Sequence, residues 1–219
     1  IGASEEKVEN MTVPRLTTAL AGPLPDLERQ LIKSQAETEH WLEHETPFYA
    51  SVDLRNSGFK LAPIDTNLFP GGFNNLNPQF HPLCVQAAMS AIEKACPDAR
   101  GMVLVPENHT RNQYYFQNLA VLQTILPNAG VNVRIGSLLR EITAPTEITL
   151  DSGAKLKLEP LERRGNRVVV NGFDPCVVLL NNDLSAGTPE ILMNLEQALL
   201  PPLHAGWTVR RNSHHFAPY

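Results

Sequence analysis

The chain has few of the features that mark specialised classes of protein. Only three cysteines occur among 219 residues, Cys84, Cys96 and Cys176, and they show no CxxC spacing. This usage does not indicate a disulfide framework, and three reduced, mostly buried thiols are expected. No apolar run reaches the roughly 18 residues that a membrane helix requires, and the acidic first residues lack the apolar core of a signal peptide. We therefore expect a cytoplasmic location and no membrane partner.

Positive charge and metal-binding patterns are also scarce. Lys and Arg number 18 against 23 Asp and Glu, which gives a formal net charge of −5. A nucleic-acid-binding domain usually carries a basic patch, but the only basic cluster is the short segment 210–215, so no nucleic-acid partner is expected. His40 and His44 have the i, i+4 spacing of a helix face without a third ligand at an obvious spacing. No metal site is therefore expected.

Motifs of known chemistry are missing too. The chain contains no GxxxxGK[ST], no GxGxxG and no GxSxG, so a Walker loop, a dinucleotide fingerprint and a hydrolase elbow have no support. What is present is enough apolar material for a core, with 42% hydrophobic residues, and an unusual number of prolines, 18 in all. This composition excludes wholesale disorder and favours long ordered loops over a helical bundle.

The apolar pattern alternates between short strands and helices. Helical periodicity is seen over 24–45, 82–95, 110–126 and 188–199. The first begins near Asp26, the third has Thr110 and Gln113 as a capping box, and the fourth begins with Thr188-Pro189. Strands are expected over 49–54, 59–64, 101–105, 131–135 and 177–180. Three further short strands in 146–171 indicate a β-meander.

This alternation is typical of an α/β fold with a mainly parallel sheet and helices on both faces. We expect the meander at 146–171 to be appended to the main sheet. No composition shift indicates a boundary, so a single domain over 1–219 is predicted.

Two strand-to-loop junctions share one form. The strand at 103–105 runs into Pro106-Glu107-Asn108-His109, and the strand at 178–180 runs into a polar loop over 181–187, each before an expected helix. Ligands of open α/β sheets bind beyond the carboxyl ends of the strands, and helix N-termini favour anions. Arg111, in the first turn of one expected helix, would strengthen a carboxylate or phosphate site. The alternative is that these polar residues only cap and turn.

The segment 65–82 is the most unusual stretch of the chain. It is rich in Pro, Gly and Asn and poor in charge. Its glycine pair, Gly71-Gly72, would let backbone approach a ligand closely. Asparagine side chains both donate and accept hydrogen bonds, which suits zwitterionic ligands. On composition alone, a plain loop is an equal alternative.

Four runs of sequence carry a resemblance to a known family. They are Phe48-Tyr49-Ala50-Ser51-Val52-Asp53-Leu54-Arg55, the stretch Lys60 to Leu76, Pro106-Glu107-Asn108-His109-Thr110-Arg111-Asn112 and Leu180-Asn181-Asn182-Asp183-Leu184-Ser185. Together they resemble the proteobacterial glutamate–cysteine ligases that are related to ATP-grasp enzymes. The resemblance implies a Rossmann-like, pre-ATP-grasp α/β domain on the substrate side of such a ligase.

The resemblance also implies a reaction. ATP would phosphorylate the γ-carboxyl of glutamate, and the amine of cysteine would attack the γ-glutamyl phosphate to form γ-glutamylcysteine, the first step of glutathione synthesis. Mg²⁺ would bridge the phosphates. Because family members are considerably longer, we expect this chain to be an N-terminal part, inactive alone, with ATP and Mg²⁺ bound mostly by residues outside it.

The alternative is a stand-alone α/β module that binds an amino acid or a nucleotide without catalysis. In either case the polar residues at the strand ends and in the 65–82 segment are the candidate substrate contacts, while no catalytic residue is assigned. The candidates are Arg55, Asp65, Asn67, Asn74, Asn75, Asn108, Arg111, Asn181, Asn182 and Ser185.

Overall fold

The computed structural model describes residues 46–108 and 112–209 of the chain. These residues belong to two compact units, of which the smaller includes 52–65 and the larger comprises 48–51 together with 66–209. Whether the chain folds as one domain over 1–219 stays a prediction. The helix expected over 24–45 lies outside the described residues.

The smaller unit contains a two-stranded sheet. Strand β1 (Ser51–Asn56) and strand β2 (Leu61–Asn67) are joined by a turn in which the Gly58 N–H donates to Asn56 Oδ1 at 2.8 Å. Gly58 has a φ of +87°, a conformation that glycine adopts without strain. The two predicted strands are therefore confirmed, with bounds shifted by about two residues.

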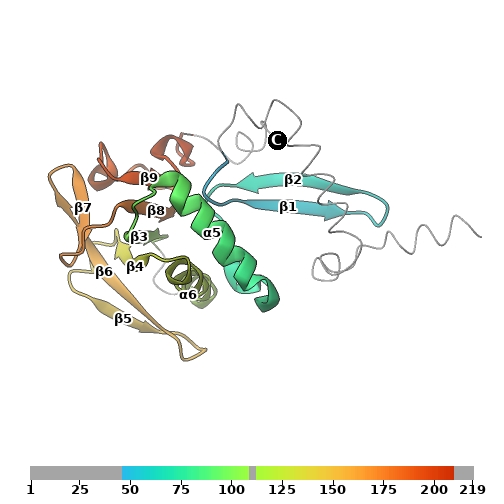
Figure 1. Ribbon diagram of the computed structural model, residues 1–219, viewed down its shortest axis with the longest axis horizontal. Helices are drawn as coiled ribbons and strands as arrows, with labels where there is room; N and C mark the ends of the chain where they lie inside the picture. Colours follow the sequence, from blue (N-terminus) through green and yellow to red (C-terminus); the bar gives the residue numbers. More distant parts are fainter. Residues whose placement is uncertain (1–45, 109–111, 210–219) are drawn as a thin grey trace, which may run out of the picture. The chain divides into compact units, whose positions relative to one another are not determined.

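The larger unit is built on a seven-stranded mixed sheet (Figure 1). Its order is β5-β6-β4-β3-β8-β9, with β7 paired to β6. The strands are β3 (Gly101–Pro106), β4 (Asn132–Ser137), β5 (Thr146–Thr149), β6 (Lys155–Arg164), β7 (Arg167–Val170), β8 (Val177–Asn181) and β9 (Ala198–Leu200). The β6–β4–β3–β8–β9 pairings are parallel. The α/β class and the mainly parallel sheet are confirmed.

The meander predicted over 146–171 is present. Strand β6 pairs antiparallel with β5 at its start and with β7 at its end, while its residues 158–160 run parallel to β4. The turn after β5 is closed by a hydrogen bond from the Gly153 N–H to the Leu150 carbonyl at 2.8 Å. Since β6 is shared, the meander extends the main sheet rather than forming a separate one.

Alternation along the central strands divides the core in two. Met102 and Leu104 face one side of β3, and Val103 and Val105 face the other, all four at 0% exposure. A strand buried on both faces reads as a continuous apolar run, which is why 101–105 and 177–180 were recognisable in the sequence.

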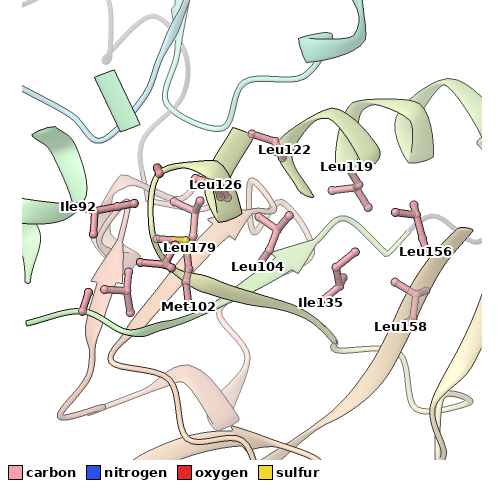
Figure 2. Close-up of a cluster of buried hydrophobic side chains, with 14 of the residues drawn as sticks. Ile92, Met102, Leu104, Leu119, Leu122, Leu126, Ile135, Leu156, Leu158 and Leu179 are labelled. Carbon is pink, nitrogen blue, oxygen red and sulfur yellow. The ribbon is translucent and has the colours of Figure 1, made fainter. Parts of the chain in front are cut away.

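One face of the sheet is covered by helices. Helix α5 (His81–Ala95) and helix α6 (Gln113–Asn128) both contribute to the first core cluster, and Figure 2 shows Leu119, Leu122 and Leu126 of α6 packed over the sheet residues. Each buried leucine of this kind contributes about 1.5–3 kcal/mol by leaving water. The described residues show no helix longer than eight residues other than these two.

The second face is covered by irregular chain. Its cluster contains Leu184, Leu192 and Ala205, from the segment after β8, together with β7 residues and Phe69. Up to residue 209 this segment has no α-helix: it forms the short 3-10 turns η3 (Glu190–Leu192) and η4 (Leu203–Ala205), with strand β9 between them. The expectation of helices on both faces, and with it the Rossmann-like layout, is not confirmed by the described residues.

The helix predicted over 188–199 is wrong. The chain there forms η3 and then strand β9, and Asn194 between them has a φ of +53°, which no helix interior contains. The Arg163 guanidinium accounts for part of this, because it donates to the carbonyls of Ile191 at 2.9 Å and Met193 at 2.6 Å. Those carbonyls would otherwise accept hydrogen bonds within a helix.

The segment 65–82 is shorter as a loop than predicted. Strand β2 continues to Asn67, and two 3-10 turns, η1 (Phe73–Asn75) and η2 (Pro78–Phe80), lead into α5. A membrane-spanning helix is not found within residues 46–108 and 112–209.

Candidate functional site

The carboxyl ends of two central strands meet at one edge of the sheet. Pro106 of β3 pairs in parallel register with Asn181 of β8, so Glu107 and Asn182 begin the two loops side by side. In parallel sheets this edge is where ligand sites are found. The strand ends therefore position the polar residues that the sequence placed in two separate junctions.

Asn181 lies at the centre of a hydrogen-bond network and is only 2% exposed. Its Nδ2 donates to the Pro70 carbonyl at 2.7 Å, and its Oδ1 accepts from Asn118 Nδ2 at 3.2 Å. The Tyr115 hydroxyl lies 3.0 Å from the same Oδ1 and 2.9 Å from the Asn181 carbonyl. A buried amide that uses both its donor and its acceptor in this way is a rigid anchor.

Two buried tyrosine hydroxyls flank this asparagine. The Tyr115 hydroxyl accepts the Glu107 N–H at 2.7 Å, and the Tyr49 hydroxyl donates to the Leu180 carbonyl. Burial raises the pKa of Tyr115 well above its usual value of about 10, and the nearby Glu107 carboxylate raises it further. Burial likewise raises the pKa of Tyr49. Asn181 and the two tyrosines are therefore polar and uncharged at neutral pH, with the Glu107 carboxylate beside them.

The backbone of the glycine- and asparagine-rich loop is hydrogen-bonded to Asn118 and Asn181. The Phe73 N–H donates to Asn118 Oδ1 at 2.9 Å, and the Pro70 carbonyl is the partner of Asn181. The Phe73 ring stacks on Tyr49 with centroids 5.9 Å apart and an interplanar angle of 24°. Residues 70–73 are thus fixed at the carboxyl edge of β8.

The two glycines of this loop differ in what the fold requires of them. Gly72 has a φ of +80° and caps η1, so a side chain there would be strained. Gly71 is exposed, and a Cβ added to it would meet no heavy atom within 4 Å. Since none of the residues that the structure describes crowds position 71, the space beside it would allow close approach by another molecule.

The loop after β8 is closed by its own side chains. Asn182 Nδ2 donates to the Pro106 carbonyl at 2.9 Å, and its Oδ1 accepts the Leu184 N–H at 2.9 Å. The Asp183 N–H donates to Glu107 Oε1 at 2.7 Å, and the Ser185 N–H donates to Asp183 Oδ1 at 2.8 Å. These amide groups are occupied, so the helix N-terminus expected here as an anion site is not present.

At the other junction the helix is real, but it begins later than predicted. The residue that caps α6 is Asn112, whose side chain accepts the Tyr115 N–H at 3.2 Å. The predicted cap Thr110 and the predicted anion-binding Arg111 both precede this residue and lie outside the described residues.

The predicted contacts are distributed over both units. In the larger unit, Asn181 and Asn182 are buried in the network, whereas Asn75, Asn108 and Ser185 are exposed on the three loops that meet there. Asn67 and Asn74 are half-buried, and Asn67 Oδ1 accepts the Phe69 N–H at 2.8 Å. Arg55 and Asp65 belong to the smaller unit. Their roles as substrate contacts stay predictions.

The sequence reasoning missed four members of the network: Tyr49, Glu107, Tyr115 and Asn118. One sequence signal could have identified Asn118. It lies beside Leu119 on the apolar, buried face of α6, and a buried amide needs a hydrogen-bond partner. Tyr115 precedes it by one helical turn and points the same way. Neither residue revealed its partner on β8, which lies more than sixty positions away in the chain.

Acidic groups are present at the edge but do not form a metal centre. Glu107 and Asp183 are joined through the Asp183 backbone N–H. Within residues 46–108 and 112–209 no group of three His, Cys, Asp or Glu side chains is placed to hold a metal ion. The exposed amide and hydroxyl groups on the loops are suited to hydrogen-bonding recognition of a polar ligand.

Comparison with known proteins identifies relatives. The model of the GshA family, glutamate–cysteine ligase, matches residues 28–219. The chain is similar to a solved structure from Methylobacillus flagellatus KT that is assigned as a gamma-glutamylcysteine synthetase, with 60% identity and a TM-score of 0.77. The match covers 94% of this chain and 50% of that protein, so the chain spans half of its length. No curated protein matches the chain.

Proposed function

The chain belongs to the glutamate–cysteine ligase family, and from that premise we propose that it forms the amino-acid side of an ATP-dependent ligase. The enzyme would join the γ-carboxyl of glutamate to the amine of cysteine through a γ-glutamyl phosphate. Supporting this, the solved relative at 60% identity is assigned the same activity. An ATP-grasp relationship, a cytoplasmic location and inactivity of this chain alone belong to the same proposal.

The observation that carries the proposal is the meeting of three polar loops at the ends of β3 and β8. The loops contain Asn75, Asn108 and Ser185 as exposed polar side chains. Amide and hydroxyl groups can donate to a carboxylate and accept from an ammonium, so this set suits amino acids. We propose that they hold the substrate's polar groups while the buried network beneath them supplies rigidity.

Rigidity matters because a ligase must hold a carboxylate and an amine within reacting distance. Asn181 ties residue 70 to the end of β8, and Asn118 ties residue 73 to α6. A loop anchored in this way loses little further freedom when a substrate binds. Gly71, between the two anchor points, leaves room for the substrate to contact main chain directly.

ATP would activate the carboxylate as an acyl phosphate, and Mg²⁺ would neutralise the phosphates. The described residues do not fit these groups, because no Walker loop and no three-residue acidic cluster is found among them. We therefore assign neither phosphoryl transfer nor metal binding to a residue of this chain.

Kinetic analysis of the full product of the gene tests the proposal. We expect glutamate- and cysteine-dependent ADP release. We also expect Asn75→Ala to lower kcat/KM for one amino-acid substrate by about ten-fold, the loss of one charge-assisted hydrogen bond. Gly71→Ala should lower it comparably without reducing stability. The matched control is Asn132→Ala, an exposed asparagine at the amino end of β4, which should leave the kinetics unchanged.

Two results would contradict the proposal in different ways. Absence of any amino-acid-dependent ADP release, with binding of an amino acid intact, would support the non-catalytic binding module instead. Full activity with unchanged kinetics in both Asn75→Ala and Gly71→Ala would show that the loop is not in contact with substrate.

A further inference from the structure

The turn after β7 contains the single Asn-Gly pair of the chain, Asn171-Gly172. Two backbone hydrogen bonds close this turn, from the Val170 N–H to the Phe173 carbonyl and from the Phe173 N–H to the Val170 carbonyl, both at 2.9 Å. Asn171 has a φ of +47° and Gly172 has a φ of +78°. A two-residue hairpin turn with positive φ at both positions is met best by Asn-Gly. The fold therefore favours this pair of residues at this place.

The same pair is chemically reactive where it is accessible. The backbone nitrogen that follows an asparagine can attack the side-chain amide carbon, and glycine hinders this attack least because it has no side chain. Asn171 and Gly172 are both exposed, and a Cβ added to Gly172 would meet no heavy atom within 4 Å. Among the described residues, none accepts a hydrogen bond from the Gly172 N–H. The attacking nitrogen is therefore not held by that part of the chain.

The side chain of Asn171 faces a buried carboxylate. Its Nδ2 donates to Glu159 Oε1 at 3.4 Å, and Glu159 is only 3% exposed. The same oxygen lies 3.6 Å from Arg134 Nη1 and 3.5 Å from Lys157 Nζ. The Arg134 guanidinium also donates to the Val170 carbonyl at 3.2 Å, at the start of the turn. The turn and the buried carboxylate thus form one cluster, in which Asn171 supplies an uncharged donor.

We propose that Asn171 is a site of spontaneous deamidation, which converts this donor into a second carboxylate. The Gly172 backbone nitrogen loses its proton to hydroxide and attacks Asn171 Cγ. A C–N bond forms and closes a succinimide ring, the Cγ–Nδ2 bond breaks, and the leaving nitrogen takes a proton from water and departs as ammonia. Water then opens either carbonyl of the ring, which leaves aspartate or isoaspartate at position 171. One amide and one water become one carboxylic acid and one ammonia, with no oxidation or reduction.

Either product places a negative charge beside Glu159. A carboxylate at position 171 has no proton to donate at neutral pH, and it repels a carboxylate that is already removed from water. Arg134 and Lys157 offset only part of this repulsion, because both already interact with Glu159. Isoaspartate also lengthens the backbone of the turn by an additional carbon atom. The modified chain should therefore melt a few degrees below the unmodified chain.

The cluster is built on β4, β6 and β7 rather than on the carboxyl ends of β3 and β8. The inference therefore does not rest on the proposed function.

Mass spectrometry of the whole chain after incubation at mildly alkaline pH tests the proposal. We expect each modified molecule to gain the mass difference between a hydroxyl and an amino group, and ammonia to be released in equal amount. Peptide mapping should place the change at position 171. Asn171→Gly introduces a residue that accepts positive φ but has no side-chain amide, so its peptide should show no gain.

Substitutions separate the consequence of the charge from the chemistry that produces it. Asn171→Asp should lower the melting temperature by a few degrees. The matched control Asn132→Asp changes an exposed asparagine at the amino end of β4 and should leave the melting temperature nearly unchanged. In a chain that also carries Glu159→Gln, the opposing charge is gone, so Asn171→Asp should lower the melting temperature by roughly half as much or less.

Three outcomes would overturn the proposal or its consequence. The first is an unmodified position 171 in the folded chain under conditions in which a synthetic peptide of residues 168–174 reacts fully. The second is the same mass gain in the corresponding peptide of Asn171→Gly, which would show that another residue reacts. The third is an equal effect of Asn171→Asp with and without Glu159→Gln, which would show that the two carboxylates do not repel each other.

Discussion

The two junctions at the carboxyl edge of the sheet look alike in sequence and differ in structure. After β3, a short loop leads to the capped helix α6. After β8, the chain makes successive side-chain-closed turns, a 3-10 turn and then a parallel strand. The first junction depends on local helix signals, and the second depends on partners from distant segments. The comparison shows that a polar loop followed by a helix signal does not by itself specify a helix.

The largest expected effect is at the second junction. Asn181→Ala removes an amide that serves Pro70, Asn118 and Tyr115, and it leaves their buried polar groups unpaired. We expect the free energy of unfolding to fall by about 3 kcal/mol in urea denaturation. The matched control Asn132→Ala, at the other edge of the sheet, should change it by less than about 0.5 kcal/mol. Equal losses of stability from the two variants would show that Asn181 does not anchor the loop.

The next effect distinguishes burial from backbone conformation in the loop after β8. Leu184 is 1% exposed and has a φ of +57°, which costs a non-glycine residue about 1–2 kcal/mol. Leu184→Ala should lose about 2–3 kcal/mol of stability, and Leu184→Gly should lose about 1 kcal/mol less than the alanine variant. At Leu192, which is buried but not at positive φ, glycine should be the worse of the two. The same order at both positions would contradict this account.

A third effect concerns the tyrosine that connects both junctions. Above pH 10 an unfolded chain releases its phenolic protons, whereas the raised pKa of Tyr115 keeps its proton in the folded state. The folded state then binds more protons, so stability falls as pH rises beyond about 10, by up to about 1.4 kcal/mol per pH unit for this group. Urea denaturation between about pH 9 and 11 should show a shallower fall for Tyr115→Phe than for the unsubstituted chain. Identical slopes would mean that Tyr115 titrates normally.

The smallest effect is at the first junction. Asn112→Ala removes the side chain that caps α6 through the Tyr115 N–H, and it should cost about 1 kcal/mol in thermal or urea unfolding. Asn112→Asp keeps a capping oxygen and adds a charge that the helix N-terminus favours, so its stability should stay within a few tenths of a kcal/mol of the original. A loss as large as that of Asn181→Ala would make the two junctions energetically alike.

Parts of the candidate site could be predicted from the sequence, because they depend on residue types that are recognisable in short segments. Gly71-Gly72 and the asparagines around them indicated a loop able to approach a ligand, and the ends of the two apolar runs indicated the edge of a parallel sheet. The partners could not be predicted, because Asn181 contacts residues from the loop at 70, from α6 and from the segment at 49. No local pattern encodes contacts of such different sequence separation.

Elements that depend on local signals can be predicted directly from the amino-acid sequence. Continuous apolar runs at 101–105 and 177–180 produce strands buried on both faces, and turn residues at 151–153 and 164–166 separate the strands of the meander. The structure of residues 188–200 depends instead on tertiary contacts. Their apolar residues follow a helical period, yet the segment forms a 3-10 turn and strand β9. Gln197 is 5% exposed and exchanges hydrogen bonds with both backbone groups of Val168, while 198–200 pair with β8. Those long-range bonds are available only in the folded sheet, so they outweigh a propensity of a few tenths of a kcal/mol per residue.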